Sequence, residues 1–555
     1  MLYLRTTFFY FSIHFLLTLK LHSKRCTLLL AVSILKVTPN LGVLNVSLKS
    51  LDARFSLLKY NAYALCTHKC QFKKSHDKNQ IQSLPCLGSF PDHVSSDPAL
   101  TLYRLWLSAV TGSHKQIDRI QGNTCAMEAA KTDKGSIPPF PTSKQFSRSS
   151  EFLLNNIRQS MKFFNPEKCI DPKGGFYHFY NEAGELFDTN VRKFVTEARF
   201  VFTYAVAYKW LGEEKYKQAV AHGVDSLRDT TKFRNEVNGA FFWELKDGVP
   251  TDKKILTYAI AFALLAYSKA VECGVDKARQ YVRETFDLME KHLWSEKFGL
   301  YAEEADENWV VTDYRSQSGN LHTCEALIAA YEATKEKFYL DRALLIAENI
   351  CIRQAGLTKG LVWEHFNEDW SAQIDFKLDD PSLIIFRPWG FQPGHQVEWA
   401  RFLLVLNKHA PAMWMVPKAR YLFDTAVKAA NDPEHGGLAY SFDLNGRHED
   451  DRLQASGHWD KVFWVQNEAL GTAAMLAIET GDASYWAWYD QQWEYVWQHF
   501  VDHKHGSWRR RMSRQNVPEF TEKTHNPKCV DPDYHILGGF DGALQWMKMA
   551  AKEEA

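Results

Sequence analysis

Four side chains in this sequence have the types needed to move protons on a small carbon compound. Three are histidines, His322, His395 and His535, and the fourth is Arg199. An imidazole titrates near neutral pH, so paired histidines can take up a proton and return it under physiological conditions. Arginine adds a permanent positive charge that stabilises a nearby oxyanion. Together these groups suit abstraction of a proton next to a carbonyl, through an enediolate.

Other polar residues lie close in sequence to these four or begin apolar segments of the same kind. Glu398 follows His395 by three positions, and residues three apart on a helix share a face, so we expect Glu398 to orient or polarise that imidazole. Tyr258 and Glu468 begin apolar segments in the same way as the histidines, and His365 lies in a loop between two of them. We expect all of them to face one cavity.

The elements that must position these residues are six apolar helices. The segments begin at residues 196, 257, 320, 395, 464 and 533. Their spacing of about 60 to 75 residues indicates a repeat architecture. Since each segment is apolar nearly all round, we expect each helix to be buried.

A second series of short segments alternates with the helices. Glycine followed by aromatic or apolar residues occurs at 174–178, 239–243, 299–301, 360–363, 436–440 and 506–508. These segments are typical of short hairpins or loops. One unit of loop, buried helix, turn and amphipathic helix therefore repeats six times. Closed on itself, it predicts an all-α (α/α)6 barrel with short β-hairpin loops at one end.

Composition supports a large apolar core and excludes one class of partner. Apolar residues make up 45% of the 555 positions, while Lys plus Arg and Asp plus Glu number 66 each. With no net charge there is no electrostatic footprint for nucleic acid. Aromatic residues reach 14%, with 18 Trp. Aromatic faces suit the apolar faces of sugars, although barrel packing explains most of them.

The first part of the chain lacks the repeat. We expect residues 1–126 to be a poorly structured extension, either a targeting segment or not part of the functional fold, 127–148 to be a linker, and 149–553 to be the barrel. The apolar runs at 7–19 and 27–37 are shorter than a membrane span and show no clear cleavage site. Scattered cysteines in the body, without glycosylation sequons, indicate a cytoplasmic protein. A secreted or anchored form would require residues 5–19 to act as a signal.

The least regular stretch of the body is 369–392, which contains Trp389 and leads into His395. A loop of this length in a compact fold is commonly functional, so we expect it to form a wall of the active site.

Three other uses of these residues stay open. Two His-x-x-Glu pairs could bind metal, although no further carboxylate pairs recur. Glycoside hydrolysis needs two opposed carboxylates, which Glu325, Glu398, Asp460 or Glu468 could supply, but the histidines and Arg199 would then lack roles. The fold could also be a sugar-binding or regulatory module without turnover.

The motifs resemble those of the N-acylglucosamine 2-epimerase superfamily over about residues 150 to 550. They are Glu197-Ala198-Arg199, Asn320-x-His322-x-x-Glu325-Ala326, Pro393-Gly394-His395-x-x-Glu398-Trp399-Ala400, Gln466-x-Glu468-Ala469 and Asp533-Tyr534-His535. The forms around His395 and His535 are more similar to the mannose isomerase and cellobiose 2-epimerase branch than to the N-acylglucosamine branch.

The resemblance implies an (α/α)6 barrel and a role for each matching residue. Arg199 would stabilise the enediolate, and His395 with His535 would be the acid/base pair. His322 would bind the sugar or help to open its ring, and Glu398 would support His395. Further sugar contacts would come from Tyr258, Trp389, Trp464, Glu468 and Ser318.

One position departs from the pattern. Related isomerases often carry Asn four residues before the His that matches His322, and here Ser318 stands there, which leaves the identity of the sugar open. The resemblance implies an aldose–ketose isomerase acting on a mannose-like sugar, or a sugar 2-epimerase of the N-acylglucosamine or cellobiose type. Neither route needs a cofactor or a metal, and the expected partner is a small sugar bound by a monomer or homo-oligomer.

Overall fold

The computed structural model describes residues 137–141, 143–377, 387–454, 457–518 and 531–553, with two short strands near the N-terminus. Contacts divide the chain into Met1–Asp133 and Lys134–Ala555. In the first unit, β1 (Phe15–Leu21) pairs antiparallel with β2 (Lys24–Leu30). The rest of the predicted extension lies outside the described residues, so its role stays a prediction. Among the helices of the described residues, none has both the length and the apolar character of a membrane span.

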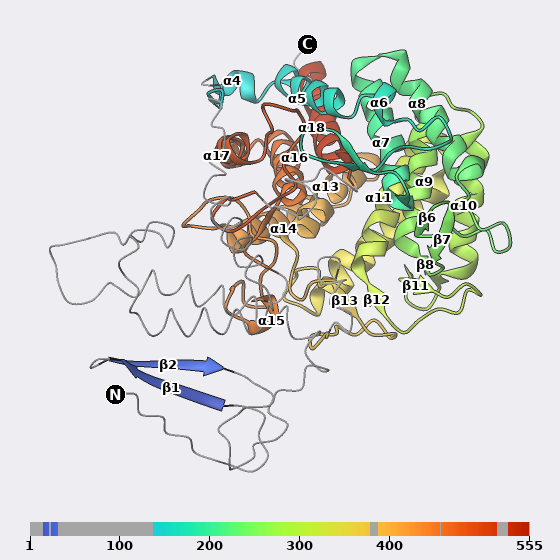
Figure 1. The fold of residues 1–555 in the computed structure, drawn as a ribbon. Coiled ribbons are helices and arrows are strands. Elements are labelled where there is room, and N and C mark those ends of the chain that lie inside the picture. Colours follow the sequence, from blue (N-terminus) through green and yellow to red (C-terminus); the bar gives the residue numbers. More distant parts are fainter. Residues whose placement is uncertain are drawn as a thin grey trace, which may run out of the picture. The chain divides into compact units, whose positions relative to one another are not determined.

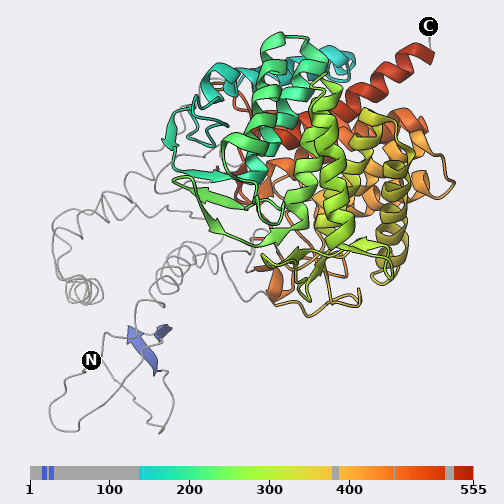
Figure 2. The same ribbon diagram turned by 90° about the vertical axis from the view of Figure 1, so that its right-hand side faces the viewer.

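Six helices form the inner ring of the second unit (Figure 1, and turned in Figure 2). They are α7 (Phe194–Leu211), α9 (Thr257–Glu272), α11 (Gln317–Thr334), α13 (Pro393–His409), α16 (Phe463–Thr480) and α18 (Tyr534–Glu553). Each packs against the next, and α18 packs back on α7, so the ring closes. In α7 every residue from Phe194 to Ala207 is buried, as expected for a helix that is apolar on all sides.

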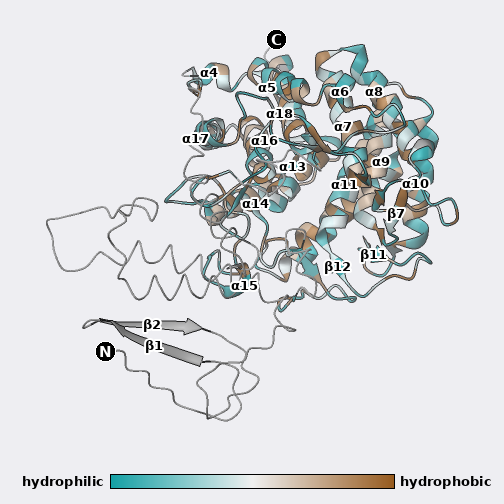
Figure 3. Ribbon diagram, in the orientation of Figure 1, coloured by the Kyte–Doolittle hydropathy of each residue, from teal (hydrophilic) through white to brown (hydrophobic). Residues whose placement is uncertain are grey.

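Six outer helices cover this ring. They are α5 (Ser150–Phe163), α8 (Glu214–Asp225), α10 (Ala278–His292), α12 (Lys337–Glu348), α14 (Met415–Ala430) and α17 (Ala483–His499). Each packs mainly on one inner helix, with α5 on α18, and several also contact a second inner helix. Only one face is apolar: α10 buries Val282, Phe286 and Met289, and hydrophilic positions run along the outer helices in Figure 3. The predicted (α/α)6 barrel is confirmed.

Short strands lie at the N-terminal ends of the inner helices. The sheets are β3 (Phe179–Tyr180) with β4 (Leu186–Asp188); β5 (Val191–Lys193), β6 (Glu244–Lys246) and β7 (Val249–Asp252); β8 (Ile255–Leu256) with β11 (Glu304–Ala305); β9 (Trp294–Ser295) with β10 (Leu300–Tyr301); β12 (Arg315–Ser316) with β13 (His365–Phe366); and β14 (Lys461–Val462) with β15 (Arg511–Met512). All pairs are antiparallel. Strands β5, β8, β12 and β14 lead directly into α7, α9, α11 and α16.

The remaining elements are single turns. They are α4 (Lys144–Ser147), α6 (Pro166–Cys169), α15 (Asp451–Gln454) and the π-helical segments η3 (Ser226–Thr230) and η4 (Asn349–Gln354). The predicted glycine–aromatic hairpins are present: Ile170 bridges Phe176, Arg234 bridges Phe241, and Val501 bridges Trp508.

Four inner helices, α7, α11, α13 and α16, begin earlier than their apolar pattern predicts, and two of these starts have a local explanation. Helix α11 begins at Gln317 because Ser316 caps it, its side chain accepting from the Ser318 N–H. Helix α13 begins at Pro393, since proline at the first helical position lacks only an N–H that would be unpaired anyway. His322 therefore lies in the second turn of α11 rather than at its start.

Candidate active site

The predicted polar residues gather at the N-terminal ends of the inner helices. Those in the first turn of their helices are Tyr258, His395 and His535, and those one turn deeper are Arg199, His322, Glu398 and Glu468. The site therefore has two layers, a rim of first-turn residues and a deeper layer of charged groups.

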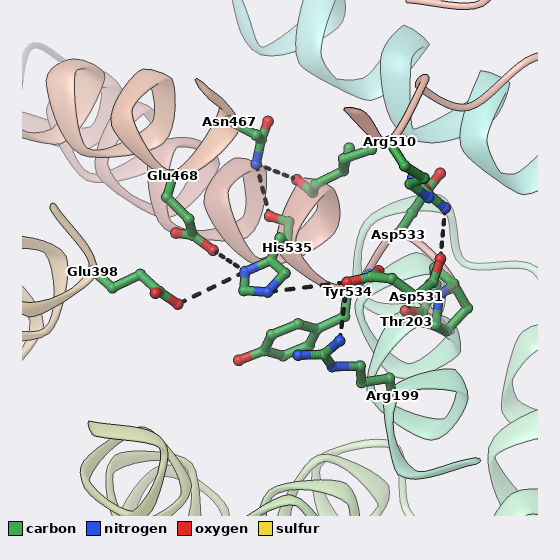
Figure 4. Close-up of polar contacts among 12 residues, drawn as sticks. Arg199, Thr203, Glu398, Asn467, Glu468, Arg510, Asp531, Asp533, Tyr534 and His535 are labelled. Carbon is green, nitrogen blue, oxygen red and sulfur yellow. Dashed lines mark hydrogen bonds and ion pairs between the residues drawn. The ribbon is translucent and has the colours of Figure 1, made fainter. Parts of the chain in front are cut away.

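His535, the second residue of α18, is backed by carboxylates (Figure 4). Its Nδ1 lies 2.9 Å from Glu468 Oε1 and 3.7 Å from Glu398 Oε1, and its Nε2 lies 4.0 Å from Asp531 Oδ2. Burial lowers the pKa of His535 well below its ordinary value, and Arg199 adds to this effect, although Asp531 opposes it. The imidazole is thus neutral at pH 7 and able to accept a proton.

Two glycines allow α18 to approach α16 closely. A Cβ on Gly471 would lie 2.5 Å from the Gly539 carbonyl oxygen, closer than real side chains come. In the space that remains, the Asn467 amide donates to the carbonyl of His535 at 2.7 Å. This packing fixes the height of His535 in the ring.

His395 is held by a different carboxylate from the one predicted. Its Nδ1 lies 2.9 Å from Glu364 Oε2, and the Gln317 amide donates to the same oxygen at 2.8 Å. Trp399 Nε1 donates to Gln317 Oε1 at 2.8 Å and so fixes the orientation of the amide. The prediction that Glu398 supports His395 is wrong, because His395 turns towards the loop of Glu364 while Glu398 faces His535.

Trp464 connects the two histidines. Its ring centroid lies 5.3 Å from that of His395 and 5.2 Å from that of His535. A Cβ on Gly394 would lie 2.0 Å from Trp464 Cζ3, so only glycine fits beneath the indole. The expected acid/base pair therefore shares one aromatic neighbour.

Arg199 holds the opposite side of the site with Tyr258. Its Nη2 donates to the Tyr258 hydroxyl at 2.9 Å, and its Nη1 to Asp531 Oδ2 at 3.2 Å. The Tyr258 ring meets the His322 ring edge to face at 4.8 Å. Burial lowers the pKa of His322 to about 4, so this imidazole is also neutral at pH 7.

Glu398 and Glu468 are buried next to each other. Burial raises the pKa of both, that of Glu398 well above its ordinary value and that of Glu468 to about 7. Arg401 Nε lies 3.1 Å from Glu468, which favours the charge on Glu468 and leaves the shared proton on Glu398. The prediction that Glu468 contacts the sugar is corrected: it is fully buried, between His535 and Arg401.

His365 was expected at the mouth, but both of its nitrogens have structural partners. Nδ1 pairs with the Tyr314 hydroxyl and Nε2 with the Pro388 carbonyl, each at 2.9 Å, and the ring stacks on Phe376. Its neighbour Glu364 reaches His395 instead. Adjacent residues in extended chain face opposite ways, and this alternation was the signal that could have identified Glu364.

Two further predicted sugar contacts stay predictions. Trp389 packs edge-on against Trp363, and the Arg452 guanidinium lies 3.8 Å from its ring centroid. Ser318 is half-buried one turn before His322. Of the predicted wall, residues 378–386 lie outside the described part of the chain.

One group in the site has the spacing of metal ligands. Ligand atoms of Glu398, Glu468 and His535 all lie within 4.8 Å of one another. The Arg401 guanidinium already provides a positive charge beside this group. The expectation that no metal is needed stays a prediction.

Comparison with known proteins agrees with the motifs. The model of the N-acylglucosamine 2-epimerase (GlcNAc 2-epimerase) family matches residues 174–539. A D-mannose isomerase from Marinomonas mediterranea is 41% identical over 392 residues, which cover 70% of this chain and 95% of the relative. A cellobiose 2-epimerase from Bacteroides fragilis is 25% identical over 376 residues, covering 62% and 85%. A crystal structure of D-mannose isomerase superposes with a TM-score of 0.67 at 39% identity, over 73% of this chain and 99% of that one.

The family match spans most of the barrel, including Arg199, His322, His395 and His535. It confirms the resemblance drawn from the motifs. This chain belongs to the N-acylglucosamine 2-epimerase family.

Proposed function

We propose that this protein is a cofactor-independent sugar isomerase that interconverts a mannose-like aldose and its ketose. The observation that carries the proposal is the placement of His395 and His535, each backed by a carboxylate, against one indole. The names of the relatives support the same reaction class: proteins called D-mannose isomerase are 41% and 32% identical to this chain.

In the proposed reaction one of these two imidazoles removes the proton from C2 of the open-chain aldose. The C–H electron pair forms the C1–C2 double bond, and the carbonyl electrons move to O1. Arg199, fixed by Tyr258 and Asp531, stabilises the charge on that oxygen. Transfer of the O2 proton to O1, with reprotonation at C1 as the C2 carbonyl forms, gives the ketose.

His322 takes a supporting role in this scheme. Its contact with Glu325 uses Nδ1, at 3.5 Å, and its ring packs against Tyr258. We propose that it binds the sugar or helps to open its ring before proton transfer.

The test is incubation with mannose, glucose, cellobiose and N-acetylmannosamine in deuterated water, followed by NMR. Formation of a ketose from mannose is the expected result. A C2-inverted aldose labelled at C2 would instead identify a 2-epimerase, which forms the same enediolate but returns the proton to C2 from the opposite face. Binding of a sugar without exchange of its C–H protons would contradict both activities.

We also propose a cytoplasmic location and a functional protein that begins near residue 127. Cys169, Cys273, Cys324 and Cys351 are free and buried, which fits a reducing compartment. Mass spectrometry of the mature N-terminus would support the proposal with a first peptide near Met127 and contradict it with one near Met1.

A further inference from the structure

Arg401 is a buried cation beneath the proposed catalytic histidines. It extends from α13, and its side chain is 8% exposed. Its Nε lies 3.1 Å from Glu468 Oε2 on α16, and its Nη2 lies 3.6 Å from Glu325 Oε1 on α11. One guanidinium thus contacts carboxylates from two different inner helices.

Each of these carboxylates uses its other oxygen for a histidine. Glu468 Oε1 is 2.9 Å from Nδ1 of His535, and Glu325 Oε2 is 3.5 Å from Nδ1 of His322. A continuous chain of contacts therefore runs from His322 through Glu325, Arg401 and Glu468 to His535. The chain crosses the floor of the site, where the charges are shielded from water and interact strongly.

The charges around Arg401 explain why a cation is needed there. Its guanidinium interacts electrostatically with Glu325 on α11, Glu468 on α16, Glu398 on α13 and the Tyr534 hydroxyl on α18. The guanidinium of Arg199, on α7, also lowers the pKa of Glu398. Three buried carboxyl groups in such a space cannot all ionise, and the loss of one guanidinium would shift protons onto them.

We propose that Arg401 is a positioning residue that favours the ionised forms of both Glu325 and Glu468 and thereby ties the charge state of His322 to that of His535. Its effect on turnover rests on the proposed isomerase function, whereas the electrostatic coupling does not. Arginine presents a rigid fork of donors, so in Arg401→Lys a single ammonium group would replace the separate Nε and Nη2 contacts with the two carboxylates.

The matched control is Lys269 at the other end of the ring. It is also a buried cation between two carboxylates, with Nζ 3.1 Å from Glu272 and 3.9 Å from Glu332. Arg401→Met and Lys269→Met each remove one such cation. Both should lower the melting temperature, but only the first should alter the histidines of the site.

The first readout is NMR titration of ¹⁵N-labelled histidine in the ligand-free protein, with His322→Asn and His535→Asn used to assign the signals. In Arg401→Met we expect both titrations to move to lower pH by about one unit, because Glu325 and Glu468 would take up protons and no longer stabilise the charged imidazoles. Arg401→Lys should give a smaller shift. Unchanged titrations in Arg401→Met, or equal shifts in Lys269→Met, would overturn the proposal whether or not the protein is an isomerase.

The second readout is the pH dependence of kcat/KM on the sugar turned over. We expect the acid limb to move to higher pH in Arg401→Met, since Glu468 and Glu325 would become protonated more readily. When Glu468 is already replaced by Gln, Arg401→Met should shift the acid limb of the profile less. A profile that superposes on that of the wild type would show that Arg401 only contributes packing.

Discussion

Helix α13 carries a histidine–carboxylate pair at each end, and the nitrogen–oxygen distance is the same in both pairs. At its start, His395 Nδ1 lies 2.9 Å from Glu364, and at its last residue, His409 Nε2 lies 2.9 Å from Glu332. The pairs differ in what surrounds them. This difference indicates which end of the barrel does chemistry.

At the C-terminal end of the inner helices, the charges around His409 have opposite partners. Glu332 also faces Lys269, and Lys209 pairs with Asp541 at 2.7 Å. At the N-terminal end, the contacts of His395 within the described residues involve Nδ1, and its ring lies beside Trp464. The two imidazoles are equally exposed, at 16%, so they differ in their neighbours: His395 shares Trp464 with His535, whereas His409 lies among ion-paired charges.

The largest expected effect separates the two ends directly. His395→Ala or His535→Ala should lower kcat/KM by about 1,000-fold, because proton transfer loses its acid or base. His409→Ala should leave turnover nearly unchanged. Steady-state kinetics with a melting curve for each variant checks this, and a large loss of activity in His409→Ala at an unchanged melting temperature would break the comparison.

The carboxylate partners should differ in the same sense. Glu364→Gln weakens a hydrogen bond to the reacting imidazole and should lower kcat by about 10- to 100-fold. Glu332→Gln should lower stability and spare kcat. If both variants lose kcat equally, the two pairs are not functionally distinct.

A smaller effect is expected at Gly394. In Gly394→Ala the new Cβ would displace Trp464, which contacts both histidines, and we expect kcat/KM to fall by about 10-fold. Gly356→Ala is the control, since its Cβ would have no neighbour within 4 Å. Equal kinetics for the two variants would show that the position of Trp464 does not matter.

The smallest effects concern acid stability. Burial alone would raise the pKa of Glu332, but His409 and Lys269 lower it to about 2, so its stabilising contribution is present above pH 4.5 and is lost as pH falls towards 2. His322 has a pKa of about 4, lowered from 6.5 by burial, so acidification from pH 6.5 to 4 protonates the unfolded chain first and destabilises the fold. The melting temperature of the wild type should therefore fall with pH in both ranges. It should fall less between pH 4.5 and 2 in Glu332→Gln, and less between pH 6.5 and 4 in His322→Asn. Unaltered slopes would contradict these assignments.

The fold was predictable from the sequence because apolar segments repeat at a near-constant spacing. Local pattern also explains why Arg199, Tyr258, His322 and His535 lie in the first two turns of inner helices, while their roles in turnover stay predictions. The partner of His395 was not predictable in this way. Glu364 comes from the loop of another repeat, and only tertiary packing brings it to α13.

The same helical spacing brings one histidine and glutamate together and leaves the other two apart. His322 and Glu325 are three residues apart in the interior of α11 and face each other at 3.5 Å. His395 and Glu398 have the same spacing, but His395 lies in the first turn and bends towards the neighbouring loop. A rule for residues inside a helix does not hold at its first turn, where the side chain can turn outward.

The most direct test of the account is a crystal structure with an open-chain sugar alcohol such as mannitol bound. We predict that C1 or C2 of the ligand lies about 3 to 3.5 Å from the imidazoles of His395 and His535, with O1 against Arg199. A hexitol bound at the C-terminal end of the inner helices, or one whose first two carbons contact neither histidine, would contradict it.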